Sequence, residues 1–291
     1  MEFAQYITYG VINGSLYALV AIGLALIMGI MGIFNIAQGS LAMIAGYGSV
    51  LFFQHLKIDP FVSLVFTLPA MFLIGVFMYL TMFMSMNKYD PGQKLRNSML
   101  VSFGLVLIME TLATILWTAN ERTVTAAYSG AVFALGDLRI PYTGLATVVL
   151  AIGVIFGLHF FLKHTTFGKS IWAVSQDHDC AMLMGVNVRR TTLAAFGIGV
   201  AISAFAGAVV SLHTVSPAIG IDWTNKALIL IVLAGVGSIN GIFFAGLLLG
   251  IVEALGVYLV GVHYTGVVGL LIFIIVLMFR PQGLFVRKAG V

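Results

Sequence analysis

The chain has 291 residues, of which 61% are hydrophobic and only 8% are charged; 14 basic and 10 acidic side chains give a net charge of +4. So few charges do not cover the surface of a soluble protein of this size, which excludes a cytosolic enzyme. Four long stretches, 3–56, 61–87, 191–221 and 227–252, carry no charge at all. Each exceeds the roughly 20 apolar residues that cross a bilayer as a helix, so the sequence predicts an all-α, polytopic membrane protein.

We expect a single transmembrane domain over residues 1–291 with about eight transmembrane helices. They are predicted near 8–30, 36–54, 61–84, 98–118, 142–162 and 191–213, followed by three crossings near 227–240, 245–260 and 265–279. The N-terminal segment lacks the basic region of a cleavable secretory signal, so the first apolar stretch is expected to stay as a span.

Alternating the loops across the membrane divides the basic residues unequally. One side receives ten: Lys88, Lys94, Arg96, Lys163, Lys169, Arg189, Arg190, Arg280, Arg287 and Lys288. The other side receives four: Lys57, Arg122, Arg139 and Lys226. Basic loops stay in the cytoplasm, so we expect the N-terminus outside and the C-terminus inside.

Polar residues interrupt the apolar stretches at three places. The candidates for a substrate path are Asn13 and Ser15, then Asn35, Gln38 and Ser40, then Ser238 and Asn240. Asn13–Ser15 and Gly237–Gly241 resemble the broken helices that mark a transporter pathway. The cluster from Asn35 to Ser40 fits either a cavity lining or a plain bend at the membrane surface.

Glu110 and Glu253 are the only acids well inside predicted spans, and neither has a basic partner in the same spans. An ionisable group in hydrocarbon faces a cavity, a partner or a pathway. Each acid therefore fixes helix packing through hydrogen bonds or takes part in ion-coupled transport.

Glycine is abundant, and Gly10/Gly14, Gly153/Gly157, Gly237/Gly241 and Gly246/Gly250 have the GxxxG spacing. This is about the number of pairs that 33 glycines in 291 residues give by chance. We expect close helix packing from them and not a dimer motif.

Signals for catalysis are weak. The Gly168–Ser170 segment lacks the earlier glycine of a phosphate-binding loop, because position 163 is lysine. The histidines have no paired metal-ligand spacing, and the single cysteine, Cys180, supplies no thiolate cluster. We expect no enzyme activity, no bound cofactor or metal, and no nucleic-acid partner.

The longest inside loop, residues 163–190, contains a short self-capped helix. Asp177 suits the N-cap, Asp179 the first turn and Gly185 the position just past the end. Exposure of apolar side chains to water is unfavourable there, so we expect them to contact either the underside of the protein itself or a groove on a partner. These residues are Ala181, Met182, Leu183 and Met184.

Across nearly its whole length the chain resembles the integral-membrane permease of branched-chain amino-acid ABC importers, the LivH type. The matching stretches are 13–19, 35–39, 173–187, 233–238 with Gly241 following, and 280–285. The resemblance implies that Asp179-Cys180-Ala181-x3-Gly185 is the equivalent of the EAA-x3-G helix that docks on the ATPase. Gln38-Gly39-Ser40 departs from the family pattern, in which a histidine, a glycine and an acid often follow one another.

The resemblance also implies partners and a location. It implies a second homologous permease, two ABC ATPases that use ATP and Mg, an extracytoplasmic solute-binding protein and the lipid of a bacterial inner membrane. Outer loops that would receive the solute contain Arg122, Asp137, Arg139, Asp222, Trp223 and Lys226. Branched-chain or other hydrophobic amino acids are the expected cargo; urea, amides and small organic acids, an ion-coupled secondary transporter, and a passive channel or purely structural subunit stay as alternatives.

Overall fold

A computed structural model of the chain describes residues 2–126, 128–135, 138–235, 237–261, 265–280 and 283–285. The first elements are α1 (Glu2–Met31), α2 (Gln38–Leu56), α3 (Pro60–Met78) with a π turn (Tyr79–Phe83) and a 3-10 turn (Met84–Lys88), and α4 (Pro91–Trp117). Next come β1 (Val132–Leu135), β2 (Leu138–Pro141), α5 (Tyr142–His164), α6 (Thr166–Gln176) and α7 (His178–Leu183). The chain continues with α8 (Val188–His213), α9 (Ile219–Ala234), α10 (Ile239–Val260) and α11 (Thr265–Phe279).

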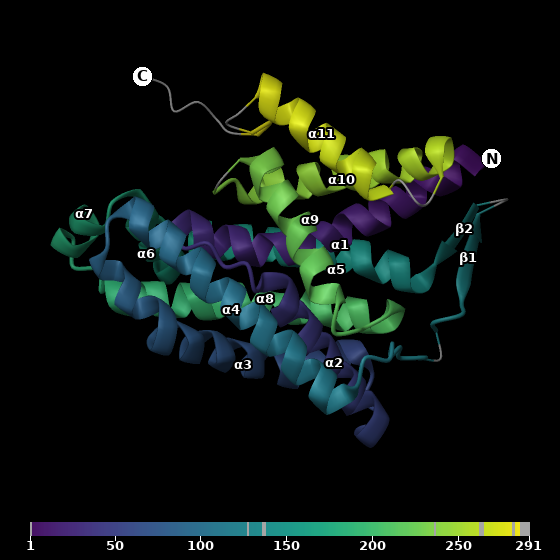
Figure 1. The fold of residues 1–291 in the computed structure, drawn as a ribbon, viewed down its shortest axis with the longest axis horizontal. Helices are drawn as coiled ribbons and strands as arrows, with labels where there is room; N and C mark the ends of the chain where they lie inside the picture. Colours follow the sequence, from purple (N-terminus) through teal and green to yellow (C-terminus); the bar gives the residue numbers. More distant parts are fainter. Residues whose placement is uncertain are drawn as a thin grey trace.

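The predicted polytopic helical fold is confirmed. Among the described residues, six helices are long and apolar enough to cross a membrane: α1, α3 with its two following turns, α4, α5, α8 and α10. The nine predicted ranges, one more than the expected total of eight, fall on these six and on the shorter α2, α9 and α11. In Figure 1 the long helices lie side by side as one bundle, and α9 runs across them.

The two ends of the bundle carry different structures. The N-terminus lies at the same end as the strands β1 and β2, and α6 and α7 lie at the opposite end (Figure 1). The strands form an antiparallel hairpin, which the sequence analysis did not anticipate. The Gln5 side chain holds the hairpin to α1: its Nε2 donates to the Arg139 carbonyl (2.6 Å), and its Oε1 accepts from the Arg139 N–H (3.0 Å).

Two of the glycine pairs face each other across α1 and α10. A Cβ on Gly10 would lie 2.7 Å from the Ile251 Cα, and one on Gly14 would collide with the Gly246 carbonyl. The helix backbones therefore touch, as small residues allow. This agrees with the expectation of close packing within one chain. Helix α1 continues unbroken through Asn13–Ser15, so the prediction of a broken helix there is wrong.

The predicted spans 227–240 and 245–260 have the wrong boundary between them. Helix α9 ends at Ala234 and α10 begins at Ile239; Gly235 (φ 88°) and Gly237 (φ 84°) adopt left-handed conformations between them, and the Ser238 Oγ caps α10 by accepting from the Gly241 N–H. Because α9 already begins at Ile219, the outer-loop residues Asp222, Trp223 and Lys226 belong to a helix. Asp137 lies outside the described residues.

Candidate functional site

The end of the bundle that carries α7 has the short capped helix predicted for the 163–190 loop. The Asp177 carboxylate accepts from the N–H groups of Asp179 (2.8 Å) and Cys180 (3.0 Å). The bond from the Cys180 N–H, helped by the Cys180 thiol and the Asp179 N–H, holds the pKa of Asp177 below its usual value. The cap is therefore ionised at neutral pH.

The other end of α7 closes in a Schellman motif. Gly185 has φ 82°, and its N–H donates to the Met182 carbonyl (2.9 Å), while the Val186 N–H reaches back to the Ala181 carbonyl (3.0 Å). A left-handed residue is required at this position, which explains the glycine. Both ends of this six-residue helix are thus fixed by local hydrogen bonds.

The apolar residues of α7 do not all face the same way. Leu183 (87% exposed), Met184 (85%) and Met182 (55%) point away from the bundle, whereas Ala181 is buried against it. Of the four residues expected to meet either the underside of the protein or a partner, Ala181 packs against its own subunit. The other three form an exposed apolar knob, defined here as Met182, Leu183 and Met184.

The polar segment from Asn35 to Ser40, which runs from the α1–α2 connection into the first turn of α2, is buried inside the bundle, and this removes the alternative of a plain bend at the surface. Asn35, Gln38 and Ser40 have no exposed surface. The Gln38 Nε2 donates to the Gly199 carbonyl of α8 (3.1 Å). Non-helical backbone of this kind is tolerated at membrane depth where protein covers it.

The same segment is tied to α9 through one hydroxyl. The Thr224 Oγ accepts from the Gly39 N–H (3.1 Å) and lies 2.9 Å from the Ile36 carbonyl, to which it donates. Side-chain atoms of Asn35 (Nδ2), Gln38 (Oε1) and Ser40 (Oγ) have no hydrogen-bond partner within the described part of the chain. The segment therefore joins α8, α2 and α9 and still has free hydrogen-bonding capacity.

The acid Glu253 is not isolated, contrary to the sequence analysis. Its carboxylate forms an ion pair with Lys226 of α9 and accepts a hydrogen bond from the Tyr17 hydroxyl (2.9 Å). The Lys226 ammonium also lies 5.3 Å from the centre of the Tyr17 ring, a cation–π distance. The Glu253 side chain is 4% exposed and that of Lys226 is 21% exposed, so the pair is accessible from the lysine side.

The remaining predicted polar residues lie in different surroundings. Asn13 is exposed on α1, one turn before Tyr17 on the same face, whereas Ser15 is buried and donates to the Val11 carbonyl of its own helix (2.8 Å). Glu110 of α4 is partly buried and faces the first turn of α9, where the Ile221 backbone and the Asp222 carboxylate lie beside its carboxyl group. The structure thus brings Tyr17, Lys226 and Glu253 together, places Asn13 one helical turn from Tyr17 on the same helix, and leaves Ser15 in a packing role.

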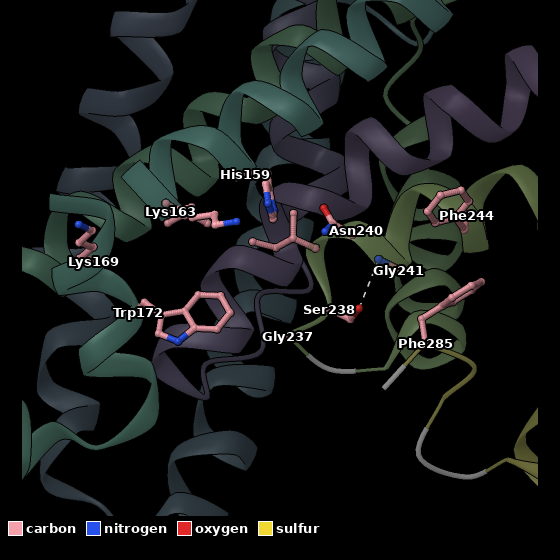
Figure 2. A pocket seen from close by; sticks show the side chains of 12 residues that line it. His159, Lys163, Lys169, Trp172, Gly237, Ser238, Asn240, Gly241, Phe244 and Phe285 are labelled. Atoms are coloured by element: carbon pink, nitrogen blue, oxygen red, sulfur yellow. Dashed lines mark hydrogen bonds between the residues drawn. The ribbon is translucent and has the colours of Figure 1, made fainter. Parts of the chain in front are cut away.

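Ser238 and Asn240 line a cavity of about 830 Å³ at the end of the bundle that carries α6 (Figure 2). Its wall also contains His159, Lys163, Lys169 and Trp172, which the sequence analysis did not predict as site residues. In the sequence, the signal that could have identified these residues is the pair Lys163 and Lys169, which follows the apolar stretch 142–162.

These features describe a multi-pass helical membrane protein. The chain belongs to the family described as branched-chain amino acid transport system, permease component, whose model matches residues 6–277. It is a multi-pass protein of the inner membrane.

Similar proteins include the high-affinity branched-chain amino acid transport system permease protein BraD of Pseudomonas aeruginosa, 28% identical over 98% of this chain and 96% of the relative. The corresponding LivH of Escherichia coli K12 is 27% identical over 99% of this chain and 96% of the relative. A probable branched-chain amino acid transport permease protein LivH of Methanocaldococcus jannaschii is 25% identical over 94% and 90%. No solved structure matches the chain.

Proposed function

We propose that the chain is the permease subunit of an ATP-binding-cassette importer and that α7 is the element on which a separate ATPase docks. The observation that carries this proposal is the apolar knob: three large side chains project from a rigid, doubly capped helix at one end of the bundle. Solvent contact with such side chains is unfavourable by about 25 cal/mol per Å², so a partner groove is the stable environment for them.

The orientation follows from the charges beside this helix. Lys169, Arg189 and Arg190 are exposed near α7, so its end of the bundle is the cytoplasmic one under the positive-inside rule. ATP and Mg act in the ATPase subunits, because this sequence has no phosphate-binding loop of its own. The complete importer contains two ATPases, a second homologous permease and an external solute-binding protein.

The solute path runs along the face that carries Asn13, Tyr17, Lys226 and Glu253. Polar groups on membrane helices mark such paths, and this is the place where an ion pair is reachable from outside the bundle. A branched-chain or other hydrophobic amino acid carries its ammonium and its carboxylate on the same carbon atom. Lys226 can bind the carboxylate and Glu253 the ammonium, while the Tyr17 and Trp223 rings, 5.7 Å apart, face the apolar side chain.

The docking proposal is tested by replacing Leu183 with aspartate. Because Leu183 is almost fully exposed, Leu183→Asp should leave the fold intact and abolish co-purification of the ATPases, along with ATP-driven uptake of leucine. The matched control is Leu56→Asp, which places the same charge on an exposed leucine at the end of α2. Retained ATPase binding in Leu183→Asp, or uptake by the isolated subunit driven by an ion gradient, would overturn the proposal.

A further inference from the structure

The cavity between α5, α6 and the start of α10 combines a charged rim with an apolar interior. Lys163 and Lys169 supply the charge, and Leu162, Phe244 and Phe285 supply apolar wall. In Figure 2 the Lys163 side chain extends toward His159 and Asn240, and the Trp172 indole lies across the cavity from Ser238. No acidic residue is found among the described residues that line it.

Local structure places this cavity at the depth of lipid headgroups. Lys163 lies in the last turn of the membrane helix α5. The following helix, α6, is amphipathic: Ile171 and Val174 are buried, while Lys169 and Trp172, three residues apart, share the exposed face. Trp172 is 56% exposed, and exposed tryptophan beside lysine is typical of the boundary between hydrocarbon and water.

The electrostatics of the cavity favour an anion. Neither Lys163 nor Lys169 forms an ion pair with any residue that the structure describes. The 22-residue helix α10 begins at the cavity with Ser238 as its cap, and the N-terminal end of a helix carries partial positive charge. A small free anion would neutralise the two lysines at the rim, but it would leave the apolar wall formed by Leu162, Phe244 and Phe285 in contact with water.

We propose that this cavity binds an anionic phospholipid of the cytoplasmic leaflet, with the headgroup phosphate at Lys163 and Lys169 and an acyl chain against Leu162, Phe244 and Phe285. Basic pockets between membrane helices on the cytoplasmic side bind such headgroups. The site requires only that this end of the bundle lies at the cytoplasmic membrane surface. It requires no ATPase, so it can fail independently of the proposed transport function.

The test uses Trp172 as the reporter. The full-length chain carrying Trp117→Phe and Trp223→Phe keeps Trp172 as its one tryptophan and is placed in bilayers of equal parts phosphatidylglycerol and phosphatidylcholine. Bromine, a contact quencher of tryptophan fluorescence, is attached in one preparation to the phosphatidylglycerol chains and in the other to the phosphatidylcholine chains. Both bilayers have the same composition, so any difference in quenching measures which lipid occupies the cavity.

Brominated phosphatidylglycerol should quench Trp172 much more strongly than brominated phosphatidylcholine. In Lys163→Gln/Lys169→Gln the preference should fall by roughly 30-fold, since each lysine near an anionic surface contributes about a factor of five. Lys88→Gln/Arg96→Gln removes two exposed basic residues from the other side of the same end of the bundle and should keep the preference. If the two tryptophan replacements impair folding, subtracting the quenching of Trp172→Phe from that of the native chain gives the same signal.

Equal quenching by the two labelled lipids would overturn the proposal, and so would equal loss of preference in the two double variants. The measurement is repeated on the chain purified together with its transport partners. Disappearance of the quenching there would show that a protein partner fills the cavity, which would also refute the lipid site.

Discussion

The Lys226–Glu253 pair is the feature whose removal has the most specific expected consequences. Replacing Lys226 by methionine keeps the length of the side chain but leaves the Glu253 carboxylate, 4% exposed, with only the Tyr17 hydroxyl as a partner. Breaking a buried ion pair from one side costs about 3–5 kcal/mol, because the other charge stays buried. Lys226→Met should therefore lower the free energy of unfolding by about 3 kcal/mol or more.

The reverse replacement should cost less. In Glu253→Gln the amide oxygen can still accept from Tyr17, and Lys226, whose side chain is 21% exposed, can turn toward water. The loss is then close to that of one charged hydrogen bond, about 1.5–3 kcal/mol. The asymmetry between the two single variants is a direct consequence of their different burial.

The double variant Lys226→Met/Glu253→Gln has no uncompensated charge and should recover most of the stability lost in Lys226→Met. Unfolding in detergent, followed by tryptophan fluorescence for all four proteins, gives an interaction free energy expected to be about 3 kcal/mol or more. If the pair binds the solute, the double variant should assemble with its ATPases but fail to take up leucine. Additive losses of stability in the double variant would refute the ion-pair reasoning, and normal uptake would refute the role in transport.

Three other replacements test separate parts of the structure. Gly14→Val should abolish folded protein in a membrane-insertion and size-exclusion assay, because its Cβ would meet the α10 backbone, whereas Gly153→Val, where a Cβ meets nothing within 4 Å, should be neutral; equal behaviour would contradict the packing. Gly185→Val should lower ATP-driven uptake, because a left-handed residue with a side chain costs about 1–2 kcal/mol. Gly185→Asn should retain most uptake, because asparagine tolerates this conformation better. Wild-type uptake by both variants would show that transport does not depend on the Schellman motif. Thr224→Val removes the hydroxyl that joins Gly39 and Ile36 and should cost about 1–3 kcal/mol in unfolding measurements, with uptake reduced more than ATPase binding; unchanged stability would mean that this bond is not needed.

The sequence predicts well those features that depend on neighbouring residues. The α7 helix is one case, because its cap and its terminating glycine act within a few residues of one another. The charge-free stretches likewise identify most membrane helices, because hydrocarbon imposes its length on any span.

Features that depend on contacts between distant segments are not predicted. Lys226 and Glu253 stand 27 residues apart, and nothing local shows that α9 crosses the bundle so that the lysine meets the acid. For the same reason, the sequence alone does not show that Gly10 and Gly14 pack against Gly246 and Gly250 of α10. The interruption at Gly237–Gly241 was visible in the sequence, but the boundary between the spans was placed too late because the apolar run continues past the two left-handed glycines, Gly235 and Gly237.

A continuous set of contacts links the proposed docking helix to the proposed solute site. Helix α7 leads into α8 within a few residues, and the Gly199 carbonyl of α8 accepts from Gln38 at the start of α2. The next residue, Gly39, donates to Thr224 of α9, and Lys226 follows Thr224 by two residues on that helix. Close-packed helices transmit a displacement largely as rigid bodies, so a pull on α7 would reach the lysine through two hydrogen bonds and without passing through lipid. Thr224→Val interrupts the second of these bonds while leaving both the apolar knob and the ion pair in place, and it therefore separates transmission from docking and from solute binding.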